Sequence, residues 1–231
     1  MEQSNIVVRV AIPEDIIYAS TITEEMASSA KARGTGIAKR SPEYVSQKMV
    51  EGKAVIALTK DNKWVGFCYI EAWGHEEFVA NSGLIVAPEF RKSGIAKTIK
   101  HRIFALSREK YPNSKIFGLT TGLAVMKINS DLGYKPVTYS ELTDDDKFWE
   151  GCKSCVNYEI LMSKGRKNCM CTAMLYDPKE HPQPIETASD FKKKSKLYER
   201  FMRLKQNKLI RYWKKKKAEK AKSFFSFFYN L

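Results

Sequence analysis

The sequence predicts an α/β fold in which a mixed β-sheet, with a parallel portion, carries helices on both faces. Two patterns lead to this prediction: a series of apolar, β-branched runs up to residue 86, and an alternation of strand and helix patterns after it. The length bears on the number of domains, since 231 residues can bury one substantial core and a small appendage. We therefore expect one domain of catalytic size.

The first part of the chain predicts a strand, two helices and a hairpin. Residues 6–11 are enriched in β-branched residues, which predicts the strand. Pro13 and the acids after it open one helix, and the N-cap Ser41 followed by proline opens another. Residues 54–59 and 64–72 are apolar runs on either side of a polar turn, which predicts the hairpin.

The next part predicts alternating elements. A strand is expected over 78–86 with a bulge at Gly83, followed by a helix with an apolar stripe from Ile95 to Leu106 and its cations on the other face. A strand over 115–121, a short helix over 123–132 and a last strand over 134–139 complete the series.

Composition divides the chain into three segments. Residues 1–145 hold the predicted domain, 146–180 a small cysteine-containing hairpin with a strand at 156–162, and 181–231 a linker and a basic C-terminal helix.

A basic, glycine-containing loop lies between the strand ending at Val86 and the helix after it. A helix start presents unpaired N–H groups and the positive end of the helix dipole, so main chain alone can bind a diphosphate. Small residues let the backbone approach the ligand, and cations add charge-assisted contacts. The candidates are Arg91, Lys92, Ser93, Gly94, Ile95 and Ala96. The alternative is an ordinary basic turn that caps an amphipathic helix.

The string Val86-x-Pro88-x-Phe90-Arg91-x-x-Gly94-Ile95-Ala96 resembles the central motif of the GNAT N-acetyltransferases. Leu132-Gly133-Tyr134, after a short helix, resembles their second landmark, and the similarity covers residues 5 to about 140.

The resemblance implies a GNAT fold with acetyl-CoA or succinyl-CoA as co-substrate. Strand 78–86 would diverge from strand 115–121, and the pantetheine arm would lie between them, paired with main chain near Ile85 and Val86. The backbone loosened by Gly83 would offer an N–H to the thioester oxygen, where negative charge develops during acyl transfer.

The resemblance leaves the catalytic side chains open. Many GNAT enzymes have a tyrosine as acid where this chain has Asn129, and a glutamate on the central strand where it has Ala80. The remaining candidates for a base are Glu71, His75 and Glu76. For Glu71 the alternative is a solvated carboxylate at a strand end.

Three cations in a glycine-bearing loop, Arg33, Lys39 and Arg40, are candidates for binding a carboxylate, with hydroxyl contacts from Thr120 and Thr121. The alternative is solvated surface charge. This loop, the segment 116–122 and the later Cys-Lys-Ser-Cys resemble the stand-alone N-acylglutamate synthases of bacterial arginine biosynthesis. That resemblance implies L-glutamate as acceptor.

Four cysteines form two close pairs, Cys152 with Cys155 and Cys169 with Cys171. Brought together by a hairpin, they could form a structural zinc site, although Cys-x-Cys is a less usual ligand spacing. The alternatives are packed thiols or a redox pair.

The net charge of +14 belongs mainly to the tail, because residues 189–222 hold 15 Lys or Arg against three acids, a net +12. A helix there could pack on its own protein or on a second subunit as a homo-oligomer, which we favour, or bind nucleic acid or an anionic membrane. The sequence shows neither a signal-like N-terminus nor a membrane-length apolar run, so we expect a soluble, cytoplasmic protein.

The leading function is N-acylation of a small amino acid. A GNAT acting on a protein or peptide amine is the second, and an inactive CoA-binding interaction protein with a basic tail is the third.

Overall fold

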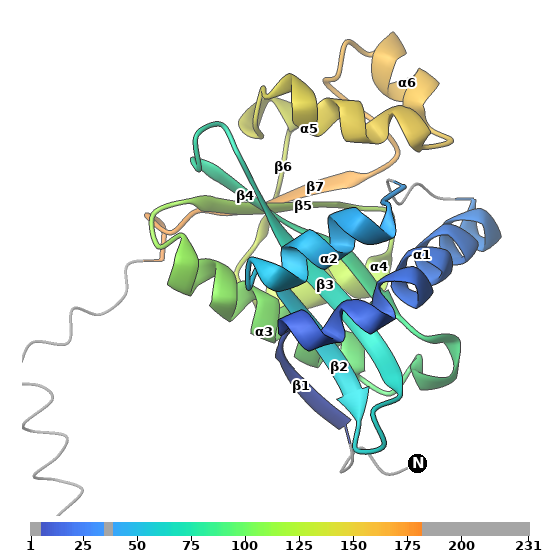
Figure 1. Cartoon of the computed structure of the whole chain (residues 1–231). Coiled ribbons are helices and arrows are strands. Elements are labelled where there is room, and N and C mark those ends of the chain that lie inside the picture. Colours follow the sequence, from blue (N-terminus) through green and yellow to red (C-terminus); the bar gives the residue numbers. More distant parts are fainter. Residues whose placement is uncertain (1–5, 35–38, 182–231) are drawn as a thin grey trace, which may run out of the picture. The chain divides into compact units, whose positions relative to one another are not determined.

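Seven strands form one mixed sheet in the order β1-β2-β3-β4-β5-β7-β6 in a computed structural model, which describes residues 6–34 and 39–181. The strands are β1 (Ile6–Val10), β2 (Ala54–Thr59), β3 (Trp64–Trp73), β4 (Phe78–Val86), β5 (Lys115–Thr120), β6 (Lys135–Val137) and β7 (Thr172–Tyr176). The helices are α1 (Ala19–Arg33), α2 (Pro42–Val50), α3 (Ile95–Lys110), α4 (Leu123–Asp131), α5 (Asp146–Glu150) and α6 (Tyr158–Ser163). The predicted mixed α/β fold is confirmed (Figure 1).

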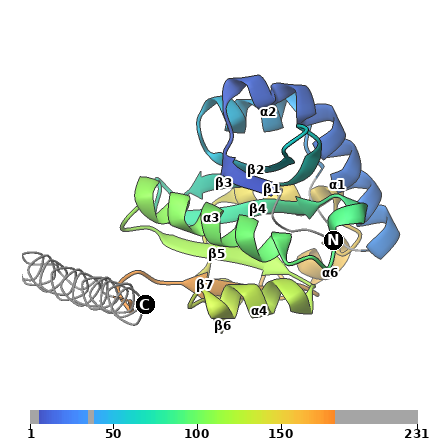
Figure 2. The same cartoon turned by 90° about the horizontal axis from the view of Figure 1, so that it is seen from below.

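Helices cover both faces of the sheet because side chains alternate along each strand. On β2, Ala54, Ile56 and Leu58 are buried in a core shared with α1 and α2, whereas Val55 and Ala57 face a second core with α3. Figure 2 shows α1 and α2 on one face and α3 and α4 on the other.

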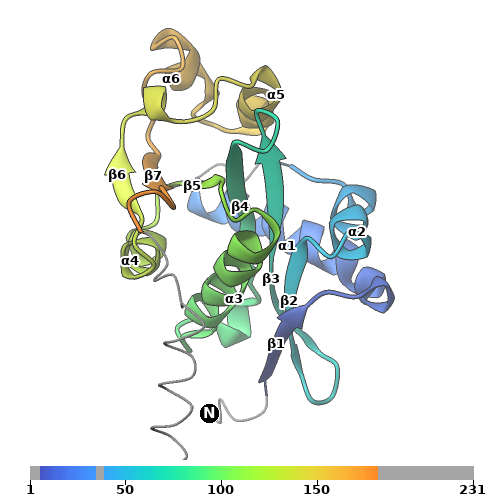
Figure 3. The same cartoon turned by 90° about the vertical axis from the view of Figure 1, so that its left-hand side faces the viewer.

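A third core covers the face of β5 and β7 opposite to α4. It joins Phe117 of β5 to Trp149 of α5 and Leu161 of α6. Figure 3 shows α5 and α6 together at one end of the sheet. The segment between β6 and β7 is therefore helical, and it lies over the same part of the sheet that opens between β4 and β5.

Strands β4 and β5 separate after a short parallel contact. They pair from Phe78 with Lys115 to Ala80 with Phe117, after which β4 follows β3 as far as Val86 and β5 follows β7. The predicted divergence of these two strands is confirmed, and it opens a gap in the sheet.

A bulge in β4 lies beside this gap, as predicted. The register between β3 and β4 shifts between Phe67 and Tyr69, where Gly83 has a φ of 64°. An added Cβ on Gly83 would lie 2.3 Å from Cε1 of Tyr69, so both the conformation and the close approach require glycine.

One expectation for the later part of the chain is wrong, and one strand was missed. Residues 156–162 are not a strand, because Tyr158–Ser163 forms helix α6, and Thr172–Tyr176 forms a strand that we did not predict. Val156, Ile160 and Met162 of this segment are exposed, whereas Leu161 is buried.

The contacts divide the chain into two units, Met1–His181 and Pro182–Leu231. The predicted linker and basic helix of the tail, apart from His181, lie outside the described residues. Within the ranges that the structure describes, no helix combines the length and apolar character that crossing a membrane requires.

Candidate active site

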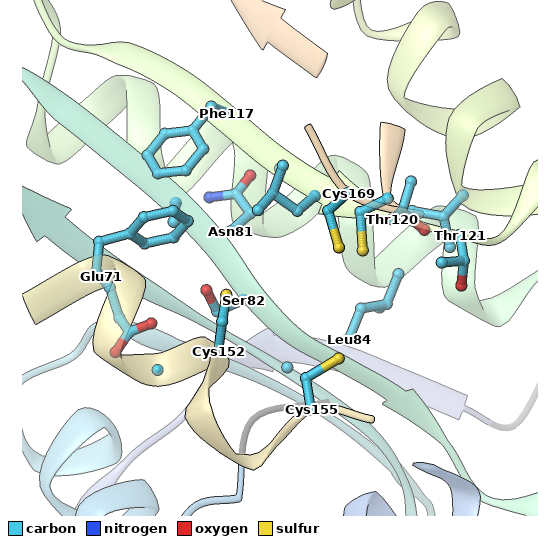
Figure 4. Close-up of a pocket in the computed structure, with 18 of the residues that line it drawn as sticks. Glu71, Asn81, Ser82, Leu84, Phe117, Thr120, Thr121, Cys152, Cys155 and Cys169 are labelled. Carbon is cyan, nitrogen blue, oxygen red and sulfur yellow. The ribbon is translucent and has the colours of Figure 1, made fainter. Parts of the chain in front are cut away.

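A cavity of about 450 Å³ passes through the gap between β4 and β5. On the α1 and α2 face of the sheet its lining includes Arg40 and Glu71, and on the α3 and α4 face it includes Lys100 and Asn129. Residues of β4, β5 and the segment between β6 and β7 form its walls, among them Ser82, Gly83, Leu84, Thr120, Cys152 and Tyr158. Figure 4 shows Glu71, Phe117 and Thr121 around this cavity, with Asn81 and Ser82 on the intervening strand. Side chains from both faces of the sheet therefore contribute to one cavity.

A charged network occupies one end of the cavity. Glu71 of β3 is 4% exposed and accepts a hydrogen bond from the hydroxyl of Tyr44. Arg40 Nη2 lies 3.5 Å from Glu71 Oε2, and Arg40 Nε donates a 2.9 Å hydrogen bond to Tyr69 Oη. The carboxylate and the guanidinium are therefore held beside each other at the cavity wall.

Burial sets the ionisation of Glu71. It raises the pKa of the carboxyl group above its usual value, and the positive charge of Arg40 opposes this increase. Burial also raises the pKa of the Tyr69 hydroxyl, so Tyr69 presents a neutral hydroxyl to Arg40. A carboxylate whose pKa is raised is a stronger base than an ordinary one, so Glu71 can accept a proton from a group in the adjoining cavity.

The other end of the cavity is polar and deeply buried. Asn129 is 1% exposed, its Nδ2 lies 3.7 Å from Met174 Sδ, and its Oδ1 has no hydrogen-bond partner among the described residues. Asn81 lies on β4 directly after the last residue paired with β5, and its Nδ2 donates a 2.7 Å hydrogen bond to Ser107 Oγ. Asn129 can offer a hydrogen bond to a ligand here, although an amide cannot supply a proton.

The loop before α3 presents main-chain donors. Gly94, the N-cap of α3, has a φ of 83°, and Lys92 before it has a φ of 62°. Lys97 and Thr98 both donate to the carbonyl of Gly94, so the N–H groups of Ile95 and Ala96 lie ahead of the first helical hydrogen bonds. Ser93 Oγ donates a 2.6 Å hydrogen bond to the carbonyl of Phe90, which steadies the loop.

Arg91 is engaged within the protein. Its Nε donates to the carbonyl of Val86, and its Nη2 contacts Glu25 Oε1 of α1 at 2.5 Å. A phosphate contact by this side chain would compete with Glu25, so the diphosphate hypothesis depends on the main chain. Ile85, Val86 and residues 91–96 are not among the lining residues of the central cavity, which reaches Leu84 on this strand.

The predicted acceptor residues lie in different places. Arg40, Thr120 and Thr121 line the cavity, and Thr120 Oγ1 accepts a hydrogen bond from the N–H of Gly122. Lys39 is exposed, and its N–H donates to Ser154 Oγ. The side chain of Arg33 lies outside the described part of the structure. Of the three loop cations, Arg40 is the one whose described side chain reaches the cavity.

His75 and Glu76, which sequence offered as further candidates for a base, lie in the exposed turn between β3 and β4. Neither is among the residues that line the cavity. Of the three candidates, Glu71 is the one that the fold brings to the cavity.

The four cysteines Cys152, Cys155, Cys169 and Cys171 all line the cavity, but the zinc expectation is unsupported. Over the described residues, no group of three or more His, Cys, Asp or Glu is arranged to hold a metal ion. The expected hairpin strand is helix α6, and Cys155 Sγ accepts a hydrogen bond from the N–H of Asn157. Burial raises the pKa of Cys152 to about 11 and that of Cys171 to about 12, which favours neutral thiols.

Lys100 is a lining residue that we did not predict, and our expectation that the cations of this helix face outward is wrong for it. Lys100 is 2% exposed, within a face formed by Ala96, Phe104 and Ser107. The spacing of these small and apolar neighbours at i−4, i+4 and i+7 was the available signal. Tyr69 was also missed, because an aromatic residue on a buried strand is usually core.

No protein-family model and no curated protein matches the chain. Among solved structures it is similar to N-acetylglutamate synthase from Neisseria gonorrhoeae, solved with coenzyme A and N-acetylglutamate, at 16% identity and a TM-score of 0.53. That match covers 76% of this chain and 36% of the other, so the chain spans about a third of that synthase.

Two further structures match over most of their own length. Rv2747 from Mycobacterium tuberculosis, solved with CoA, is 18% identical with a TM-score of 0.52, covering 74% of this chain and 98% of the other. A GNAT-superfamily phosphinothricin acetyltransferase from Sinorhizobium meliloti, solved with acetyl-CoA, is 15% identical with a TM-score of 0.50, covering 75% and 88%. Together with the split sheet and the α3 loop, these likenesses show that the chain has the GNAT acetyltransferase fold.

Proposed function

We propose that the chain is an acyl-CoA-dependent N-acyltransferase that transfers an acetyl or succinyl group to the amine of a small carboxylate-bearing acceptor, L-glutamate in the first instance. The observation that carries this proposal is the cavity that passes through the sheet between β4 and β5. A thioester reaching this gap from the α3 face would meet an amine reaching it from the Arg40 and Glu71 face. Two reactants held in this way react far faster than in solution.

The donor side is the N-terminus of α3. The main-chain N–H groups of Lys92 to Ala96 would hold the diphosphate of acyl-CoA, because the positive φ of Gly94 lets the backbone turn into the helix without a side chain in the way. The arm would then follow β4 past Ile85 and Val86 toward the bulge at Gly83.

The acceptor side is the Arg40 and Glu71 network. Arg40 has five N–H donors and would bind a carboxylate of the acceptor with those that its described partners leave available. Glu71 would accept the proton that the ammonium group must lose before its nitrogen can attack. Thr120 and Thr121 would add hydroxyl contacts from the opposite wall.

Acyl transfer then follows from these positions. The neutral amine attacks the thioester carbon, and a main-chain N–H near Gly83 stabilises the negative oxygen of the tetrahedral intermediate. The carbon–sulfur bond breaks and the amide forms as the nitrogen gives up its remaining extra proton to solvent. Asn129 donates a hydrogen bond to the departing thiolate, and solvent supplies the proton that makes it a thiol.

The size of the cavity favours a small acceptor over a protein amine. A volume of about 450 Å³, bounded by the segment between β6 and β7, suits an amino acid and an acyl group. We also propose that residues 1–145 provide the catalytic framework and that 146–180 close the cavity.

The decisive experiment measures release of the CoA thiol by purified full-length protein. L-glutamate, other amino acids and an acidic peptide with a free N-terminus would be tested with acetyl-CoA and with succinyl-CoA. We expect release with glutamate well above background, and loss of it in Glu71→Gln. Release with the peptide and not with amino acids would favour the protein-amine function, and binding of CoA without release from any amine would favour an inactive CoA-binding protein.

A further inference from the structure

Lys100 is a buried cation at the closed end of the gap. Its Nζ lies 3.5 Å from Asn81 Oδ1 and 5.3 Å from the centre of the Tyr134 ring. Tyr134 Oη donates a 3.1 Å hydrogen bond to the same Asn81 oxygen, so a single amide oxygen serves both groups. An ammonium group has three donors, and Asn81 satisfies one of them weakly at this distance.

Lys100 has no described carboxylate beside it. The ion pairs among the described residues that involve α3 and its loop join Arg91 to Glu25 and Lys97 to Asp131, and none includes Lys100. Burial lowers the pKa of Lys100 to about 8, and the titratable group that opposes this decrease is the thiol of Cys68 on β3, whose own pKa burial raises to about 11. Because lysine is almost never fully buried unless it is paired, a site for an anion is the simplest explanation.

The position of Lys100 indicates which anion. Asn81 is the first residue of β4 after the strands part, whereas Gly94 lies beyond the open end of the gap, after Val86. Lys100 lies six residues along α3 from Gly94, about 9 Å along the helix axis. A CoA arm that starts at the helix N-terminus and follows β4 therefore points its acyl end toward Asn81 and Lys100.

We propose that Lys100 Nζ binds the terminal carboxylate of a dicarboxylic acyl group, such as succinyl, and so makes the chain selective for succinyl-CoA over acetyl-CoA. This inference rests on the proposed function, because it requires that acyl-CoA bind in the gap. A succinyl group places an anion two methylene groups beyond its carbonyl carbon, whereas an acetyl group ends in a methyl and leaves the ammonium without a counter-charge. Asn129 lines the same end of the cavity, and its Oδ1 has no hydrogen-bond partner in the part of the chain that the structure describes. A 180° rotation of the amide exchanges Oδ1 and Nδ2, so Asn129 can face a succinyl or an acetyl group with either atom.

The test compares kcat/KM for succinyl-CoA and acetyl-CoA with one acceptor, in the wild-type protein, in Lys100→Met and in Lys110→Met. Lys110 is an exposed lysine at the end of the same helix and provides the matched control. We expect the wild type and Lys110→Met to prefer succinyl-CoA by about 10- to 100-fold, the effect of one charged hydrogen bond, and Lys100→Met to lose this preference.

The outcomes separate this inference from the proposed function. Turnover of acetyl-CoA with equal or greater kcat/KM than succinyl-CoA in the wild type overturns the role of Lys100 and leaves the acyltransferase standing. A Lys100→Met variant that loses both activities equally, with an unchanged melting temperature, also overturns it. If that variant does not fold, the wild-type preference and a Lys100→Gln variant decide. Failure of the wild type to bind or turn over any acyl-CoA contradicts the proposed function itself.

Discussion

Glu71 is under two opposing electrostatic influences at the cavity wall. Burial disfavours its ionised form, whereas Arg40 at 3.5 Å favours it, and burial has the larger effect on the pKa. The hydroxyl of Tyr44 fixes one carboxylate oxygen, which leaves the group oriented as well as perturbed. A carboxylate in this condition is suited to accept a proton from a nearby ammonium group.

The first prediction is that Glu71→Gln lowers kcat by about 100-fold, the usual contribution of a general base, and removes the acid limb of the pH profile. Since the pKa of Glu71 is raised, wild-type kcat/KM should fall with decreasing pH at a higher pH than an ordinary carboxyl, near 4.3, would give. Steady-state rates from pH 5 to 9 measure this. Glu76→Gln, in an exposed turn, should behave as the wild type.

The second prediction concerns Arg40. In Arg40→Gln the positive charge that lowers the pKa of Glu71 is lost, so the acid limb should move to higher pH. The KM for the acceptor should rise by about 10- to 100-fold if Arg40 also binds its carboxylate. Lys39→Gln removes the neighbouring exposed cation as a control and should change neither value. An unshifted limb in Arg40→Gln would disconnect Arg40 from the base.

Sequence reached part of this network. Asn129 was a candidate because it matches the position of the tyrosine acid of many GNAT enzymes, Glu71 because it is a carboxylate at the end of the preceding strand, and Arg40 because it is one of three cations in a glycine-bearing loop. Tyr69 and Lys100 were not, because their contribution depends on which residues from distant elements surround them. Lys100 was assigned to the outer face of α3 by its charge, although its neighbours one turn away are small or aromatic.

At the scale of elements, strand β4 and helix α3 together form two features of the site. These are the gap between β4 and β5 and the helix N-terminus that we propose binds acyl-CoA. The bulge at Gly83 lets β4 continue along β3 while β5 turns to β7, and the loop after Val86 leads directly to the N-terminus of α3. The gap and the N-terminus of α3 therefore both belong to one strand–loop–helix unit, formed by β4, the loop after Val86 and α3. A change in that loop should affect CoA binding before it affects the rest of the fold.

The third prediction tests this with Gly94→Ala, measured by calorimetric titration with CoA. Alanine at a φ of 83° costs about 1–2 kcal/mol, and relief of that strain would move the amides that face the diphosphate. We expect the dissociation constant to rise by about tenfold or more. Gly165→Ala is the matched control, because Gly165 has a φ of 56° and open space around its Cα. Equal CoA affinity in the two variants would refute the loop's role.

Elements with a strong local signal were predicted well. The strands before residue 90, helix α3 and helix α4 each combine a clear periodicity with a turn, cap or glycine at an end. Helix α6 and strand β7 were not found, because neither short segment has a periodicity that separates helix from strand. Their identity depends on packing against β5, which is distant in sequence.

At the scale of the whole molecule, charge and site lie in different parts of the chain. Residues 189–222 carry a net +12 of the total +14, whereas every described lining residue of the cavity lies between Arg40 and Cys171. The contacts also group Pro182–Leu231 as a unit separate from Met1–His181. Catalysis and the basic tail should therefore be separable by deletion.

The fourth prediction is that a chain ending at His181 keeps kcat/KM for acyl transfer within about twofold of the full chain, because every described lining residue of the cavity precedes His181 in the sequence. It should lose the salt-dependent retention on heparin that 15 clustered cations give the full chain. Both chains would be assayed at low and at physiological salt. The comparison separates electrostatic attraction of the anionic CoA by the tail from a contribution of the tail to the active site. A loss of more than tenfold in kcat/KM at both salt concentrations would mean that the tail completes the active site. A loss confined to low salt would mean that it attracts CoA from solution, because attraction of that kind is screened by added ions.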